Sequence, residues 1–142
     1  MDLRIEVDVP HAVDDVAAVV EDLDHYPSWM TLVHSVSADG AEAWWVELRG
    51  RVGPLTRSKR LRMERTVHES GRVRFERRET GPRRHSDWTL ETRWSASGLV
   101  TRVTTDLHYG GRLWSSMIER VLHDEVEKSK RRLDEYVAGR RG

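Results

Sequence analysis

The sequence contains no cysteine among its 142 residues, which excludes disulfide bonds and thiolate metal sites. Nothing in it argues for an oxidising compartment. No apolar run approaches the ~20 residues of a membrane-spanning helix, and the amino-terminal residues lack the apolar core of a signal peptide. We therefore expect a cytoplasmic protein without a membrane span. The length predicts one domain, residues 1–142, large enough for one hydrophobic core.

The common motifs of catalysis and metal binding are also missing. The chain has no nucleophile elbow and no glycine-rich phosphate loop. None of its seven histidines forms an HxH or HExxH pattern. His123 and Glu127 could share a helix face, but two ligands do not hold zinc. We predict neither a metal site nor a cofactor, and the residues leave open whether the protein is an enzyme.

The net charge is zero, but the charges are unevenly distributed. Residues 1–50 carry two arginines against eleven acids, whereas residues 51–84 carry twelve basic residues against four acids. The basic block 51–84 is either the solvated outer face of paired strands or a docking site for an anionic partner. Single-stranded nucleic acid usually requires aromatic side chains among the basic ones. Because Phe75 is the only aromatic residue in the block, we expect no nucleic acid partner.

Hydrophobic periodicity predicts an α+β fold. Alternation of apolar and polar residues indicates strands with one buried face, and apolar residues at helical spacing indicate helices. The predicted strands cover residues 3–9, 32–38, 42–49, 55–67, 73–79, 88–94 and 101–109. A helix is predicted over 13–23, a turn or second short helix over 25–30, and one long amphipathic helix over 113–137. A curved antiparallel sheet with one long helix across it leaves a cavity between the two, which is typical of a small-molecule binder.

The inward positions of these elements supply the candidate cavity wall. Trp88 and Trp94 share an inward face with Leu90, and tryptophan suits cavity walls because it combines a flat apolar ring with one polar group. Packing in a solid core is the alternative for each of them. The predicted wall consists of Met63, Phe75, Trp88, Leu90, Trp94, Val103, Met117 and Val121.

Charged residues interrupt two otherwise apolar strand faces. Arg65 shares parity with apolar residues of its strand, and Arg77 and Glu79 share parity with Phe75. A buried charge needs a partner or a ligand. One interpretation is that these residues emerge into solvent or pair with neighbours. The other is that an arginine orients a carbonyl or carboxylate of a ligand in the cavity.

With these elements in place, the whole chain resembles the START-like superfamily, also called SRPBCC or Bet v 1-like. It looks most like the polyketide cyclase/dehydrase and coenzyme Q-binding branch. The resemblance rests on Val9-Pro10, on the segments 23–30, 77–83 and 98–103, and on the final helix. It implies a helix-grip fold, in which a seven-stranded antiparallel sheet wraps a long carboxy-terminal helix. One or two short helices follow the first strand, and a deep apolar pocket lies between sheet and long helix.

The resemblance also implies a function. Members bind lipids, quinones, polyketides, sterols or plant hormones, and some catalyse cyclisation or dehydration. We expect binding of a hydrophobic small molecule. The alternatives are an aromatase/cyclase acting on a carrier-bound polyketide, with an acidic carrier protein at the basic block, and an accessory protein that acts through its surface. Aromatase-type members use an arginine and hydroxyl groups in the pocket, and here Arg65, Arg77 and Tyr109 are the candidates for those roles.

Overall fold

The computed structural model describes residues 2–52, 54–79, 85–110 and 118–141, and side chains in all of these except 51, 52, 118–124 and 141. Seven strands form a single antiparallel sheet. They are β1 (Asp2–Val9), β2 (Val33–Ala38), β3 (Ala43–Val52), β4 (Leu55–Glu69), β5 (Arg72–Arg77), β6 (Trp88–Ser97) and β7 (Val100–Tyr109). The three helical elements are α1 (Val13–Val20), the 3-10 helix η1 (Leu23–Ser28) and α2 (Ile118–Arg141).

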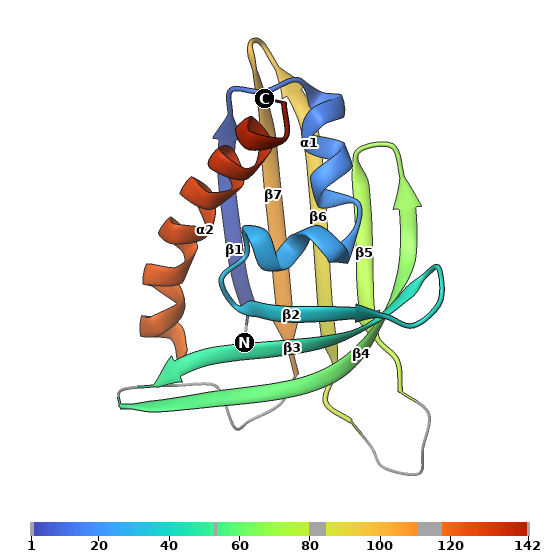
Figure 1. Ribbon diagram of the computed structural model, residues 1–142, viewed down its shortest axis with the longest axis vertical. Coiled ribbons are helices and arrows are strands. Elements are labelled where there is room, and N and C mark those ends of the chain that lie inside the picture. Colours follow the sequence, from blue (N-terminus) through green and yellow to red (C-terminus); the bar gives the residue numbers. More distant parts are fainter. Residues whose placement is uncertain (1, 53, 80–84, 111–117, 142) are drawn as a thin grey trace.

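The strand order is β1-β7-β6-β5-β4-β3-β2, so the first two strands of the chain form the two edges of the sheet. Figure 1 shows β1, β7, β6 and β5 running along the molecule while β2, β3 and β4 run across it. The long strand β4 joins the two directions, and its register with β5 shifts between Arg65 and Val67. A bulge of this kind bends a strand and increases its twist. The sheet therefore curls into an open half-barrel with a concave face.

The hairpin between β4 and β5 depends on one glycine. Gly71 has φ +82°, a conformation that L side chains rarely adopt, and a Cβ there would lie 3.1 Å from the carbonyl oxygen of Trp94. Glycine is the residue that populates this region at no steric cost. Its turn brings β5 back against β4 and β6.

The helices cover the concave side of the sheet. The first turn of α1 carries Asp14 and Asp15, which favourably oppose the helix dipole, and its buried valines face β6 and β7. The described part of α2 packs mainly against β1, β3, α1 and η1. Figure 1 shows α1 and η1 in front of the sheet and α2 along the β1 side.

The predicted α+β helix-grip architecture is confirmed. All seven predicted strands and both predicted helices are present, and the short second helix after β1 is η1. Several boundaries differ from the predicted ones. β3 continues to Val52 because it stays paired with β4, and β4 continues to Glu69 because it stays paired with β5. β6 continues to Ser97, whereas β5 already ends at Arg77 and α1 at Val20. The start predicted for the long helix, residue 113, lies outside the described residues.

Candidate functional site

Most of the predicted wall residues lie on the concave face and are buried. Trp88 pairs with Tyr109, Leu90 lies between Phe75 and Leu107, and Trp94 pairs with Val103. Met63 on β4 lies opposite Arg77 on β5. Of the other predicted wall residues, Met117 lies outside the described residues, and Val121 lies in α2 with its side chain outside them.

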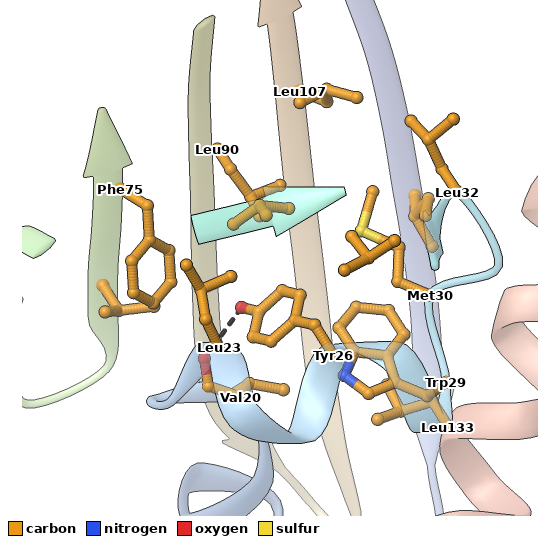
Figure 2. Close-up of a cluster of buried hydrophobic side chains, with 14 of the residues drawn as sticks. Val20, Leu23, Tyr26, Trp29, Met30, Leu32, Phe75, Leu90, Leu107 and Leu133 are labelled. Atoms are coloured by element: carbon orange, nitrogen blue, oxygen red, sulfur yellow. Dashed lines mark hydrogen bonds between the residues drawn. The ribbon is translucent and has the colours of Figure 1, made fainter. Parts of the chain in front are cut away.

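One half of the concave face is filled by the protein's own side chains. Figure 2 shows Tyr26 and Trp29 of the η1 region inserted between the sheet and α2, with Trp29 beside Leu133. The ring centroids of Tyr26 and Trp29 are 5.0 Å apart, and Tyr26 and Phe75 pack in a T-shaped arrangement with centroids 5.8 Å apart. Phe75 is thus part of a packed core at this end.

Trp94 and Val103 belong to the same filled half. They pair three residues away from the β6–β7 hairpin, and α1 packs against β6 and β7, covering that end in Figure 1. We therefore expect a ligand cavity toward the opposite ends of these strands, where Trp88 and Tyr109 lie. The cavity itself stays a prediction.

The Trp88 end of the concave face combines aromatic rings with charge. The rings of Trp88 and Tyr109 lie 4.4 Å apart, and Lys59 Nζ lies 5.6 Å from the Tyr109 ring centroid. Arg77 forms an ion pair with Glu79, and these side chains are only 8% and 11% exposed. We call Lys59, Arg77, Glu79, Trp88 and Tyr109 the polar end.

Arg77 is fully engaged by neighbouring protein groups. Besides its pair with Glu79 it donates to His85 Nδ1 at 3.1 Å and to the carbonyl oxygen of Ser86 at 3.4 Å. These residues border a surface hollow of about 280 Å³ whose lining is mostly charged. A buried charge needs a partner, and Glu79 is that partner for Arg77. Arg77 therefore needs no ligand to neutralise it.

Lys59 was not among the predicted site residues. It shares parity on β4 with Leu61 and Met63, which is the signal that places it on the concave face. Burial lowers the pKa of its ammonium, and the nearby Arg77 lowers it further, while Glu79 acts in the opposite direction. Within the described residues no carboxylate lies at ion-pair distance from it, and its recorded contact is the face of the Tyr109 ring.

Two buried indole N–H groups have no acceptor among the described residues. Trp29 is 0% and Trp88 is 3% exposed, and neither Nε1 atom has a hydrogen-bond partner. Buried donors are normally paired, and an exception calls for an explanation such as an absent ligand or water. The Trp88 donor lies at the polar end, beside Tyr109.

Arg65 lies on the same face but takes a different role. It donates to both carboxylate oxygens of Glu42, at 2.7 and 2.8 Å, and to the carbonyl oxygen of Glu21 at 2.9 Å. Glu21 ends α1, and a basic group there satisfies a free carbonyl and opposes the helix dipole. Arg65 therefore links the end of α1 to the sheet, and it does not belong to the polar end.

The sequence model of the family described as polyketide cyclase / dehydrase and lipid transport matches residues 2–138. The chain belongs to this family. No curated protein matches it.

Solved structures share the family's fold at low identity. The protein TTHA0849 from Thermus thermophilus is 18% identical over 100% of both chains, with a TM-score of 0.72. A START superfamily protein from Mycobacterium smegmatis is 12% identical over 97% of both chains, with a TM-score of 0.71. The Zhui aromatase/cyclase from Streptomyces sp. R1128 is 15% identical over 100% of this chain and 96% of its own, with a TM-score of 0.63. These likenesses show the fold of the family, not an activity.

The basic block 51–84 of this family member is largely neutralised on its convex face. Arg62 pairs with Asp39 and Glu64, at 2.8 and 2.7 Å. Other outward arginines also form ion pairs with acids, namely Arg72–Glu91, Arg74–Glu76, Arg78–Glu64 and Arg78–Glu76. Arg60 instead lies over the Trp45 ring at 5.0 Å. Acids on the same or neighbouring strands and in the adjoining turn thus offset most of the positive charge of these outward arginines.

The histidines serve as contacts between elements. His11 Nε2 lies 2.7 Å from Asp134 Oδ1, and His25 Nδ1 lies 2.9 Å from the Tyr136 hydroxyl, so both bind α2 to the segment after β1. Among the described residues, no three histidines or acids gather in a group that could hold a metal ion. No described helix has the length and apolar character to cross a membrane.

Proposed function

We propose that this protein binds a hydrophobic small molecule, of lipid-, quinone- or polyketide-like character, between the concave face of the sheet and α2. The observation that carries the proposal is the indole N–H of Trp88, a buried donor for which the described part of the chain supplies no acceptor. An unpaired buried donor costs about 1–3 kcal/mol. A ligand oxygen at this position would remove that cost.

The surroundings of Trp88 support the proposal. Met63 and Leu90 present apolar surface on the same face, and Tyr109 stacks against the indole. Apolar walls with a few placed polar groups are typical of small-molecule sites. Membership of the polyketide cyclase / dehydrase and lipid transport family agrees with such a ligand.

Native mass spectrometry of freshly purified protein, followed by organic extraction, tests the proposal and does not require the ligand to be chosen in advance. We expect a bound species of a few hundred daltons that is lost on denaturation. A neutral apolar dye, Nile red, supplies the second test. Its titration should change tryptophan fluorescence, and Trp88→Phe should remove much of that change. Trp45→Phe is the control, because Trp45 lies on the convex face beneath Arg60. Saturable binding that leaves Trp88 fluorescence unchanged would place the ligand elsewhere.

A second candidate is an aromatase/cyclase that acts on a carrier-bound polyketide. Arg77 and Tyr109, two of the three residues that the family resemblance nominates for catalysis, lie at the polar end together with Glu79 and His85. An acidic carrier protein would dock on the outward arginines, where charge attraction speeds encounter.

The convex-face ion pairs favour the simple binder over this candidate, because most of the outward arginines that the structure describes are paired with acids. The test is charge reversal at Arg60 and Arg78, which avoids the more buried Arg72–Glu91 pair. Association with an acidic carrier protein that is tight at low salt, weak at high salt and lost in the Arg60→Glu/Arg78→Glu variant would support the cyclase. Association that is absent in the parent would rule out carrier docking at this block.

A further inference from the structure

The polar end holds one positive charge that no carboxylate of the described residues balances at ion-pair distance. Arg77 and Glu79 form a buried ion pair and neutralise each other. Lys59 lies beside this pair and over Tyr109, without a carboxylate at ion-pair distance among the described residues. Partly buried charges are normally paired or ligand-bound. Lys59 therefore gives the polar end an excess charge of about +1.

A second unsatisfied group borders the same aromatic ring. Trp88 stacks on Tyr109 at 4.4 Å, and its Nε1–H, a donor only, has no acceptor. The ammonium of Lys59 lies 5.6 Å from the centre of that ring. Two donors of different strands, one charged and one neutral, thus both border the Tyr109 ring.

We propose that the ligand's apolar body ends in a carboxylate, which forms an ion pair with Lys59 and accepts a hydrogen bond from Trp88 Nε1–H. This inference rests on the proposed binding function and names the chemical class of the ligand. A carboxylate matches the polar end because it carries one negative charge and two acceptor oxygens. A phosphate monoester carries more charge than Lys59 balances, and a hydrocarbon or alcohol leaves the ammonium unpaired.

Arg65 and Arg77 are not the recognition groups in this arrangement. Arg65 is held by Glu42 and the end of α1, and Arg77 by Glu79, His85 and Ser86. Lys59 has no such partner among the described side chains and ends a flexible stem, so it can follow the head group of an entering ligand. Burial strengthens the attraction, because water screens a half-buried pair less than an exposed one.

The test compares ligands that differ only in their head group. Displacement of Nile red by decanoate, decan-1-ol and decyl phosphate is measured at pH 7 with the parent, Lys59→Met, Lys59→Arg and Trp88→Phe. Lys130→Met on α2, where Lys130 pairs with Glu127, is the matched control. Thermal unfolding by circular dichroism checks that each variant folds.

We expect the parent to bind decanoate at least tenfold more tightly than decan-1-ol, the range of charge-assisted hydrogen bonds. Lys59→Met should weaken decanoate alone and bring the two affinities within about twofold, whereas Lys59→Arg and Lys130→Met should keep the preference. Trp88→Phe should reduce the preference without abolishing it.

Equal affinities in the parent, a preference that survives Lys59→Met, or tighter binding of decyl phosphate would overturn the carboxylate inference and leave the proposed function intact. If neither Nile red nor any decyl compound binds the parent, the proposed function falls and this inference falls with it.

Discussion

Replacement of Tyr26 by phenylalanine tests how η1 closes the filled half of the concave face. The Tyr26 hydroxyl donates to the carbonyl oxygen of Val20 at 2.7 Å and therefore accepts from Thr92 Oγ1 at 2.8 Å. Thr92 in turn lies 3.0 Å from Thr105 Oγ1 on β7. Figure 2 shows the bond to Val20 within the apolar cluster. The network joins the end of α1, η1 and two strands.

The magnitude follows from the burial of all these groups. Tyr26 and Thr92 are both 0% exposed, so Tyr26→Phe leaves a carbonyl and a hydroxyl short of a partner where water does not reach. An unsatisfied buried group costs about 1–3 kcal/mol. We expect a loss of about 2–3 kcal/mol in the free energy of unfolding. At about 3 °C per kcal/mol for a chain of this size, Tm falls by roughly 6–9 °C.

Urea and thermal unfolding measure this loss, and Tyr136→Phe is the matched control. The Tyr136 hydroxyl binds His25 Nδ1 but is only half-buried, so water replaces it and the loss should stay below about 1 kcal/mol. A Tyr26→Phe/Thr92→Val cycle should give a coupling energy of about 1 kcal/mol. Equal losses for the two tyrosines, or no coupling to Thr92, would refute the network.

The same hydroxyl makes stability depend on alkaline pH. Burial raises the pKa of Tyr26 well above its usual value near 10, so the folded protein keeps the proton while the unfolded chain releases it. The contribution is fully present below about pH 10 and is lost as pH rises further, by up to about 1.4 kcal/mol per pH unit. The stability advantage of the parent over Tyr26→Phe should therefore shrink between pH 9 and 11. An advantage that is constant over this range would contradict the burial argument.

Three further outcomes follow from the described contacts. Arg77→Met should lower the free energy of unfolding by about 2–4 kcal/mol, measured with urea, because it leaves Glu79 charged and nearly buried. Adding Glu79→Gln should recover part of that loss. A double variant less stable than Arg77→Met alone would contradict this. Arg65 lowers the pKa of Glu42, so Glu42 stabilises the fold above its ordinary pKa and loses this effect as pH falls below that pKa. Glu42→Gln should flatten the dependence of stability on pH in this acid range. Gly71→Ala should lower Tm by several degrees because of the positive φ, and an unchanged Tm would show that the turn adapts.

The fold was largely predictable because one face of each strand is buried. Alternation in β1, β6 and β7 follows directly from that burial. The bend of β4 was not predictable, because a bulge at Arg65 leaves no periodic signal. The filling of the concave face by Tyr26 and Trp29 depends on where η1 crosses the sheet, and that is a tertiary property.

The candidate site was predictable in part. Parity correctly identified the buried aromatic residues Trp88 and Tyr109. It also identified Arg65 and Arg77 as charges on a buried face. Their partners lie outside the strands, because Glu42 precedes β3 and Glu79 follows β5. The sequence alone therefore could not separate paired from unpaired cations. Lys59 carries the same parity signal, but it was not predicted as a site residue because it lies within the basic block.

The Trp88 indole N–H offers the most direct test of ligand binding at the polar end. In a ¹⁵N-labelled protein each of the six tryptophans contributes one indole N–H signal, assigned by Trp→Phe variants. Titration with decanoate should move the Trp88 signal saturably, as its unpaired donor gains an acceptor, and leave the convex-face Trp45 signal in place. A Trp88 signal that stays fixed while decanoate binds would contradict the account.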